Sequence, residues 1–178
     1  MQRMVAAITS LPQHFDALRD RPEVYRPAAC PRCGFGRLWR HGRYQRKGDR
    51  RSQAAAPRQL TPVLRFCCVS CRRTCSRLPC CLPPRRWYDW ALQQSALLAL
   101  LLGNSVRQCS AALGPARSTL RRWRDWLQTR HDEFAFHLRS RFPEWGRAVD
   151  RCAFWQTCLA QQSLAGAMSW LDRQLTVP

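Results

Sequence analysis

Two Cys-x-x-Cys pairs constrain the fold of this chain more than any other feature of its sequence. The first is Cys30-Pro-Arg-Cys33 and the second is Cys68-Val-Ser-Cys71. Four thiolates arranged in two such pairs can complete the tetrahedral shell of a structural zinc ion. The sequence therefore predicts Zn2+ as a cofactor, held by Cys30, Cys33, Cys68 and Cys71.

The segment that carries these pairs, residues 26–84, is rich in Cys, Arg, Gly and Pro and has too few apolar residues for a core of its own. Such a segment needs a metal to hold it together. The 34 residues between Cys33 and Cys68 exceed the usual spacing of roughly 15–20. A long β-hairpin with residues 52–57 at its tip would absorb the excess, because the cost of closing a loop grows slowly with its length. We expect a small β zinc ribbon here, ending in a stiff linker at 82–86.

The choice of ligands is not unique, because His41 follows the first pair and further cysteines crowd the second, namely Cys67, Cys75, Cys80 and Cys81. Cys67 and Cys75 can be small apolar residues of the ribbon. Alternatively, Cys75, Cys80 and Cys81 would form a second metal site. A catalytic thiol is disfavoured because no His and Asn partners stand out, and a thioredoxin-like redox pair because no βαβ pattern surrounds either motif.

The chain contains 11 cysteines, an odd number that does not make a tidy disulfide framework. The N-terminus has no long apolar region typical of a secretory signal. The longest apolar run, residues 96–102, is far shorter than the ~20 residues that span a bilayer. We therefore expect a cytoplasmic protein without a membrane partner, in which paired cysteines bind metal.

The charge of the chain predicts a polyanionic partner. Its 178 residues carry a formal charge of +19, with 30 basic and 11 acidic residues, and only Lys47 among the basic residues is a lysine. A GC-rich genome would explain arginine in place of lysine but not the shortage of acids. Guanidinium groups bind phosphate and guanine in bidentate fashion and stack on bases.

Arginines follow the first cysteine pair closely and interleave with Trp39, His41 and Tyr44, a mixture suited to phosphate contact and stacking. The alternative is a solvated hairpin face. We favour nucleic-acid contact without base-specific reading, through Arg37, Arg40, Arg43 and Arg46.

Residues 85–131 have the pattern of three helices with a helix-turn-helix layout. The first ends at Gly103-Asn104, the second covers 105–113, and the third covers 117–131 after a break at Gly114-Pro115. If Leu120, Trp123 and Leu127 face the core, the opposite side of the third helix is where base and phosphate contacts belong. That side would present Arg117, Ser118, Arg121 and Arg122. An ordinary three-helix bundle with a basic surface is the alternative.

The two ends of the chain also have helical patterns. Residues 1–25 predict an N-terminal arm with one short helix after Ser10, and residues 132–178 a helical extension whose last helix is capped by Ser163. The aromatic residues of the extension either dock a partner or a second copy, or simply form a core; they are Trp145, Phe154, Trp155 and Trp170. The predicted fold is mostly α with a small β zinc ribbon, followed by the helix-turn-helix unit and C-terminal helices.

The order of these parts resembles the N-terminal DNA-binding region of bacterial insertion-sequence transposases and the small zinc-ribbon and helix-turn-helix proteins that such elements encode. The motifs that carry the resemblance are CPRCG at 30–34, GRLWRHGRY at 36–44, RF at 65–66 and CRRTCS at 71–76. It covers roughly residues 28–130. Cys67 and Cys75 depart from the pattern, because such ribbons usually have a basic or polar residue and an aromatic residue there.

Few acidic residues follow the helix-turn-helix, whereas a transposase nuclease needs carboxylates that hold two divalent metals. Those present are typical of helix surfaces and caps; they are Asp132, Glu133, Glu144, Asp150 and Asp172. We predict a zinc-dependent DNA-binding protein that is not an enzyme, with DNA and either a transposase catalytic subunit or a second copy as partners. The alternatives are an RNA-binding or transcription-associated zinc ribbon and a partner-docking adaptor.

Overall fold

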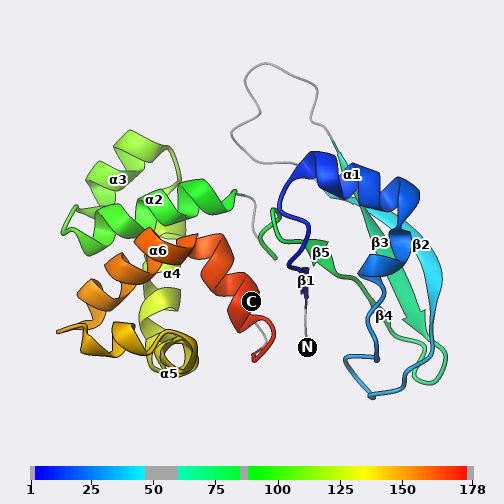
Figure 1. The fold of residues 1–178 in the computed structure, drawn as a ribbon. Helices are drawn as coiled ribbons and strands as arrows, with labels where there is room; N and C mark the ends of the chain where they lie inside the picture. The colour runs from blue at the N-terminus through cyan, green and yellow to red at the C-terminus, as the bar shows by residue number, and fades with distance from the viewer. Residues whose placement is uncertain (1–2, 47–59, 85–87, 176–178) are drawn as a thin grey trace. The chain divides into compact units, whose positions relative to one another are not determined.

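The computed structural model describes residues 3–46, 60–84 and 88–175 (Figure 1). The described part is mostly helical with a small sheet. The chain divides into two compact units: unit 1 is Met1–Asp89 with Asp172–Pro178, and unit 2 is Trp90–Leu171. The predicted hairpin tip at 52–57 and residues 85–86 of the predicted linker lie outside the described residues.

Unit 1 contains the cysteine pairs and the small sheet. Its central three-stranded sheet is antiparallel with the order β2-β3-β4, and a short parallel pair joins β1 to β5. The elements are β1 (Met4–Val5), α1 (Leu11–Asp20), the 3-10 helix η1 (Pro22–Tyr25), β2 (Leu38–Arg46), β3 (Thr61–Cys68), β4 (Thr74–Cys75) and β5 (Leu78–Pro79).

The N-terminal residues of unit 1 supply much of its core. Helix α1 begins after Ser10, whose hydroxyl accepts the N–H of Gln13, and Pro12 fits its first turn. One apolar cluster combines side chains from the first 25 residues with side chains of β2 and β3: Val5, Ile8, Ala17, Tyr25, Leu38, Leu64 and Phe66. The cysteine-rich segment, which is poor in apolar residues, therefore packs on residues 1–25.

A buried hydrogen-bond chain fastens α1 to β3. The Nε2–H of His14 donates to the carbonyl of Pro62 at 2.9 Å, and the hydroxyl of Tyr25 lies 2.6 Å from Nδ1. Because the carbonyl can only accept, Nδ1 of the neutral ring accepts the Tyr25 hydroxyl proton. Both side chains are only 1 % exposed. Burial lowers the pKa of His14 from 6.5, although the bond to Pro62 opposes this shift.

Unit 2 is built from helices. They are α2 (Trp90–Leu101), α3 (Val106–Leu113), α4 (Arg117–Thr129), α5 (His131–Arg141), the 3-10 helix η3 (Pro143–Arg147) and α6 (Arg151–Leu171). The third predicted helix, 117–131, ends two residues earlier than expected, and α5 starts directly after Arg130.

The core of unit 2 is aromatic. Phe134, Trp145, Phe154 and Trp155 are almost fully buried, and their rings meet edge to face, as at 5.3 Å between the centroids of Phe154 and Trp155. Trp145, Phe154 and Trp155 were three of the four aromatic candidates for docking a partner. Their burial shows that they form core, and Trp170 is half-buried.

Helix α6 is broken at Ser163, whose φ of 58° and ψ of 164° are not helical. The side chain of Gln94 in α2 spans the break: Oε1 accepts the N–H of Leu164 at 2.6 Å, and Nε2 donates to the carbonyl of Leu159 at 3.2 Å. The Ser163 hydroxyl accepts the N–H of Gly166, so it caps the second half of the helix. A capping role at Ser163 agrees with the sequence prediction.

Within the described ranges, no helix is both long enough and apolar enough to cross a membrane.

Candidate metal centre and basic surfaces

The two cysteine pairs come together in unit 1. The sulfur atoms of Cys30, Cys33, Cys68 and Cys71 all lie within 4.8 Å of one another. Each close pair joins the two motifs, with 3.6 Å between Cys30 Sγ and Cys71 Sγ and 3.6 Å between Cys33 Sγ and Cys68 Sγ. Bonds of about 2.3 Å to a tetrahedral zinc ion would place the sulfurs about 3.8 Å apart. This group of four thiols can therefore hold a metal ion.

The two motifs, which we call knuckles (residues 30–35 and 68–73), share one backbone arrangement. In the first, the carbonyl of Cys30 accepts the N–H of Gly34, and the N–H of Cys30 donates to the carbonyl of Phe35. In the second, Cys68 makes the same two bonds with Arg72 and Arg73. The fifth position takes a positive φ in both, 75° at Gly34 and 57° at Arg72. A residue other than glycine is strained in this conformation.

The local backbone prepares one thiol for ionisation. The N–H groups of Cys33 and Arg32 face the sulfur of Cys30 and lower the pKa of that thiol to about 6. The N–H of Arg73 acts in the same direction on Cys71, but desolvation and the sulfurs around it outweigh this effect and raise the pKa of Cys71 to about 11. A cation that binds four thiolates must displace the proton of Cys71, so metal binding will release protons.

The additional cysteines lie outside this group. Cys67 and Cys68 are adjacent in β3 and point to opposite faces, because side chains alternate along a strand. Cys75 packs against the apolar cluster of unit 1, and burial raises its pKa to about 11. In the described part of the chain, the four-cysteine group is the only set of three or more metal-ligating side chains close enough to share an ion. His41 is exposed on β2 and contacts Trp39 instead.

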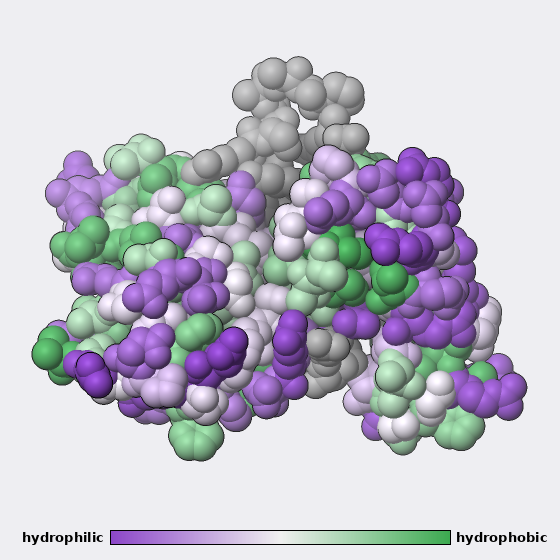
Figure 2. Space-filling view, viewed as in Figure 1, coloured by the Kyte–Doolittle hydropathy of each residue, from purple (hydrophilic) through white to green (hydrophobic). Residues whose placement is uncertain are grey.

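The predicted basic hairpin is strand β2 paired with β3. Arg37, Arg40 and Arg43 are exposed beside or on β2, and hydrophilic residues cover much of this part of unit 1 in Figure 2. Arg46 differs, because its guanidinium is largely buried and Nη2 donates to the carbonyl of Pro83. Burial lowers the pKa of Arg46. The structure thus places three of the four predicted hairpin arginines in solvent and ties the fourth to residues 82–84.

The second basic surface lies on α4. Helix α3 starts at a capping box formed by Ser105 and Gln108, and it ends at Gly114, whose φ of 91° turns the chain. The Ser110 hydroxyl donates to the carbonyl of Pro115 across this turn at 2.9 Å. Leu120, Trp123 and Leu127 of α4 are buried. The four predicted contact residues are all exposed on the other side of the helix: Arg117, Ser118, Arg121 and Arg122.

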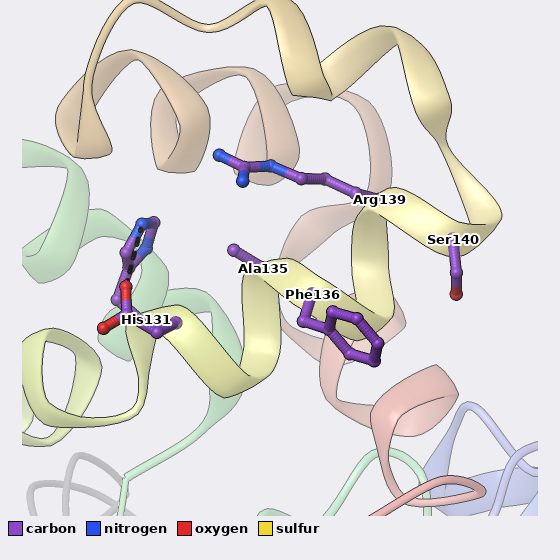
Figure 3. Close-up of a pocket in the computed structure, with 6 residues that line it drawn as sticks. His131, Ala135, Phe136, Arg139 and Ser140 are labelled. Atoms are coloured by element: carbon purple, nitrogen blue, oxygen red, sulfur yellow. Dashed lines mark ion pairs between the residues drawn. The ribbon is translucent and has the colours of Figure 1, made fainter.

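A feature that the sequence did not indicate is a hollow of about 540 Å³ along α5. Figure 3 shows His131 and Arg139 beside it, with Phe136 on the same helix. Burial and the charge of Arg151 lower the pKa of His131, which favours the neutral form of the ring. Its Nε2 lies 4.0 Å from Asp132 Oδ1, beyond hydrogen-bond distance. No hydrogen bond therefore joins His131 to Asp132, so the hollow lacks a histidine positioned by a carboxylate to act as a general base. The hollow is the weaker candidate site. It is lined by His131, Asp132, Ala135, Phe136, Arg139 and Ser140.

The acidic residues after α4 have separate surroundings. Asp150 Oδ1 accepts the N–H of Ala153 and caps α6, whereas Asp132, Glu133 and Glu144 are exposed. Asp172 is buried in unit 1, where Oδ2 accepts the N–H groups of Arg3 at 2.5 Å and Met4 at 2.8 Å. Desolvation raises the pKa of this carboxyl. Asp150 and Asp172 thus bind backbone amides of this chain.

In comparisons with known proteins, no family model matches this chain, no curated protein is significantly similar to its sequence, and no solved structure matches its fold.

Proposed function

We propose that this protein is a zinc-dependent DNA-binding protein of the type associated with insertion-sequence transposases. In this proposal, α3 and α4 act as a helix-turn-helix that reads duplex DNA, and the basic hairpin of the zinc ribbon clamps the phosphate backbone. The chain has no catalytic core of its own. Its partners are DNA and either a transposase catalytic subunit or a second copy.

The observation that carries the proposal is the orientation of α4. The buried row of Leu120, Trp123 and Leu127 turns three arginines and a serine into solvent along one face. The left-handed turn at Gly114 sets this helix directly after α3, which is the connection that recognition helices use in the major groove. A recognition helix needs both features, an anchored apolar row and an exposed polar row.

The choice of Zn2+ for the thiol group rests on its ligands. Four thiolates with sulfurs 3.6 Å apart across the knuckles fit a closed tetrahedral site. Metal content measured on the purified protein tests this choice. We expect about one zinc per chain, lost in each of the variants Cys30→Ala, Cys33→Ala, Cys68→Ala and Cys71→Ala. The matched control is Cys152→Ala, which removes an exposed cysteine of unit 2. Zinc retained in the four variants would rule out the site.

Selection from a random duplex library, followed by titration at several salt concentrations, tests DNA reading. We expect an enriched sequence that binds the zinc-loaded protein at least about a hundredfold more tightly than random duplex, well inside the usual range of specificity. The double variant Arg121→Ala/Arg122→Ala should lose this preference.

A matched control for that experiment is Arg147→Ala/Arg151→Ala, which removes the same charge from exposed positions elsewhere in unit 2. It should keep the sequence preference. If no sequence is enriched, or if the two double variants behave alike, α4 is not a recognition helix.

A further inference from the structure

The bulge in β2 places aromatic side chains on one face of the hairpin. Trp39 pairs with Cys67, and Tyr44 pairs with Val63. Cys67 and Val63 are four residues apart, so they share a face of β3, and the residues opposite them share it as well. Trp39 and Tyr44 are five residues apart, and regular alternation would place them on opposite faces. The strand contains a bulge between Arg40 and Arg43, and its extra residue brings the two rings to the same face.

Gly42 and His41 form this bulge. Gly42 has a φ of 107°, a conformation that favours glycine. The ring of His41 lies edge to face against Trp39 with 4.9 Å between the centroids, so it belongs to the same face. The hairpin thus carries one row of three rings, which we call the aromatic row: Trp39, His41 and Tyr44.

The aromatic row is open to solvent. Trp39 is 42 % exposed and Tyr44 37 % exposed, although the residues opposite them on β3 are buried. Exposed apolar side chains gathered on one face form the kind of patch that marks interaction sites, whereas single ones are normal. Between the partners Cys67 and Val63 the row extends over about 13 Å, at 3.3–3.4 Å per residue. That length accommodates two or three unstacked bases, as on the sheets of other single-strand-binding modules.

The charge around the row selects the ligand. The guanidinium of Arg65 lies over the Tyr44 ring at 5.5 Å from its centroid. Arg65 shares the face of Cys67 and Val63 on β3, and it is exposed. Between residues 24 and 88 the sequence contains a single acid, Asp49. Exposed rings beside an arginine, in a segment almost without acids, suit bases that stack while their phosphates are neutralised.

We propose that the aromatic row is a stacking site for two or three unpaired bases of a nucleic-acid strand. This inference rests on the proposed DNA-binding function and adds a second mode to it: α4 binds duplex, and β2 holds a locally opened or single strand. The ligand chemistry is an unpaired base on a sugar–phosphate chain, supplied by either DNA or RNA.

The test uses the full-length, zinc-loaded protein and three labelled probes: a 15-nucleotide thymidine strand, the 15-nucleotide uridine strand, and the duplex enriched in the selection or, without one, a mixed 15-base-pair duplex. Binding is followed by fluorescence anisotropy at one salt concentration. We expect Trp39→Ala/Tyr44→Ala to weaken binding of at least one single strand by about ten- to a hundredfold, since stacking contributes strongly per base. The affinity of the same variant for the duplex probe should change by less than about threefold.

Two further variants separate stacking from folding. Trp39→Phe/Tyr44→Phe keeps both rings and should retain single-strand affinity within about threefold. Phe136→Ala removes a ring that is 72 % exposed in unit 2 and should change nothing. Zinc content and circular dichroism of all variants should equal those of the wild type. A strand with a single 2-aminopurine should be quenched by the wild type and not by the alanine variant.

The probes distinguish this inference from the proposed function. Loss of sequence-specific duplex binding in every sample, with the single-strand effect intact, would refute the helix-turn-helix proposal alone. A single-strand affinity that stays within threefold in the alanine variant would refute the stacking site, as would equal weakening by the phenylalanine variant or by Phe136→Ala. The strand that binds more tightly, thymidine or uridine, identifies the source of the ligand.

Discussion

The main apolar cluster of unit 1 contains seven buried side chains, of which Tyr25 and Phe66 are the only aromatic ones. Unit 2 instead buries Phe134, Trp145, Phe154 and Trp155 against one another. Large rings remove far more apolar surface from water than the small residues of unit 1. Unit 1 also contains a group of four thiols that can hold a metal ion and a buried His14–Tyr25 hydrogen bond. We therefore expect unit 2 to depend mainly on aromatic burial, and unit 1 to depend also on its buried polar contact and on a metal ion held by the four thiols.

Removal of a metal ion bound by the four thiols should produce the largest difference in stability between the two units. Structural zinc contributes on the order of 10 kcal/mol to folding of small modules. We expect a chelator to abolish hydrogen-exchange protection of β2 and β3 while peptides from α4 and α6 remain protected. Exchange measured by mass spectrometry on the full chain checks this. Equal loss of protection in both units, or in neither, would contradict the comparison.

Truncation of the aromatic core should have the opposite effect. Trp155 is fully buried in unit 2, and Trp155→Ala should lower the free energy of unfolding of that unit by about 3–5 kcal/mol. Zinc content should stay unchanged, because the four proposed ligands are in unit 1. Trp39→Ala, which removes an exposed tryptophan, serves as the control and should cost less than about 1 kcal/mol in denaturant unfolding. The comparison fails if zinc is lost together with the core of unit 2.

The buried histidine should make unit 1 sensitive to acid. Burial lowers the pKa of His14 from 6.5. Below pH 6.5 the unfolded chain therefore binds a proton that the folded protein does not, so stability falls as the pH drops from 6.5 toward the folded-state pKa. At pH 7.5 we expect His14→Gln to cost about 1–3 kcal/mol, because buried partners lose their hydrogen bonds.

The stability difference between wild type and His14→Gln should narrow as the pH falls below 6.5. Thermal unfolding of unit 1 between pH 7.5 and 5.5 measures this difference, and its comparison between the two proteins cancels acid effects on the thiols. A difference that stays constant or widens would show that His14 does not control the acid sensitivity.

The smallest expected effect concerns the two knuckles. Gly34→Ala should destabilise the first knuckle by about 1 kcal/mol, because φ is positive there; the added Cβ meets no atom within 4 Å, so backbone strain is the cause. Arg72→Gly relieves the same strain in the second knuckle and should stabilise it by up to about 1 kcal/mol. Denaturant unfolding of the zinc-loaded variants should give opposite signs. Equal signs would show that the knuckles are not equivalent.

Much of the local structure follows from the sequence alone. The spacing of the two Cys-x-x-Cys pairs favours, over the neighbouring cysteines, the four thiols that the structure brings within 4.8 Å. Ser10 and Ser163 are recognisable as caps because a serine hydroxyl can accept a free N–H at a helix start. The break between α3 and α4 is predictable from Gly114-Pro115, since glycine adopts the positive φ that ends a helix.

Other features depend on contacts between residues distant in the chain. The sequence does not reveal that Arg46 donates to Pro83, because no local pattern records a partner 37 residues away. The pairing of Trp39 and Tyr44 on one face depends on a bulge that shifts the register against β3. Trp145, Phe154 and Trp155 could have formed a docking surface or a core, and only the packing of α5 and α6 decided in favour of the core.

Chemistry encoded over a few residues, such as thiol spacing, caps and turns, was thus determined by the sequence itself, because backbone geometry fixes how such groups meet. Which faces are buried, which arginines reach solvent and which rings stay exposed were decided by the tertiary structure, because burial depends on what packs opposite each side chain.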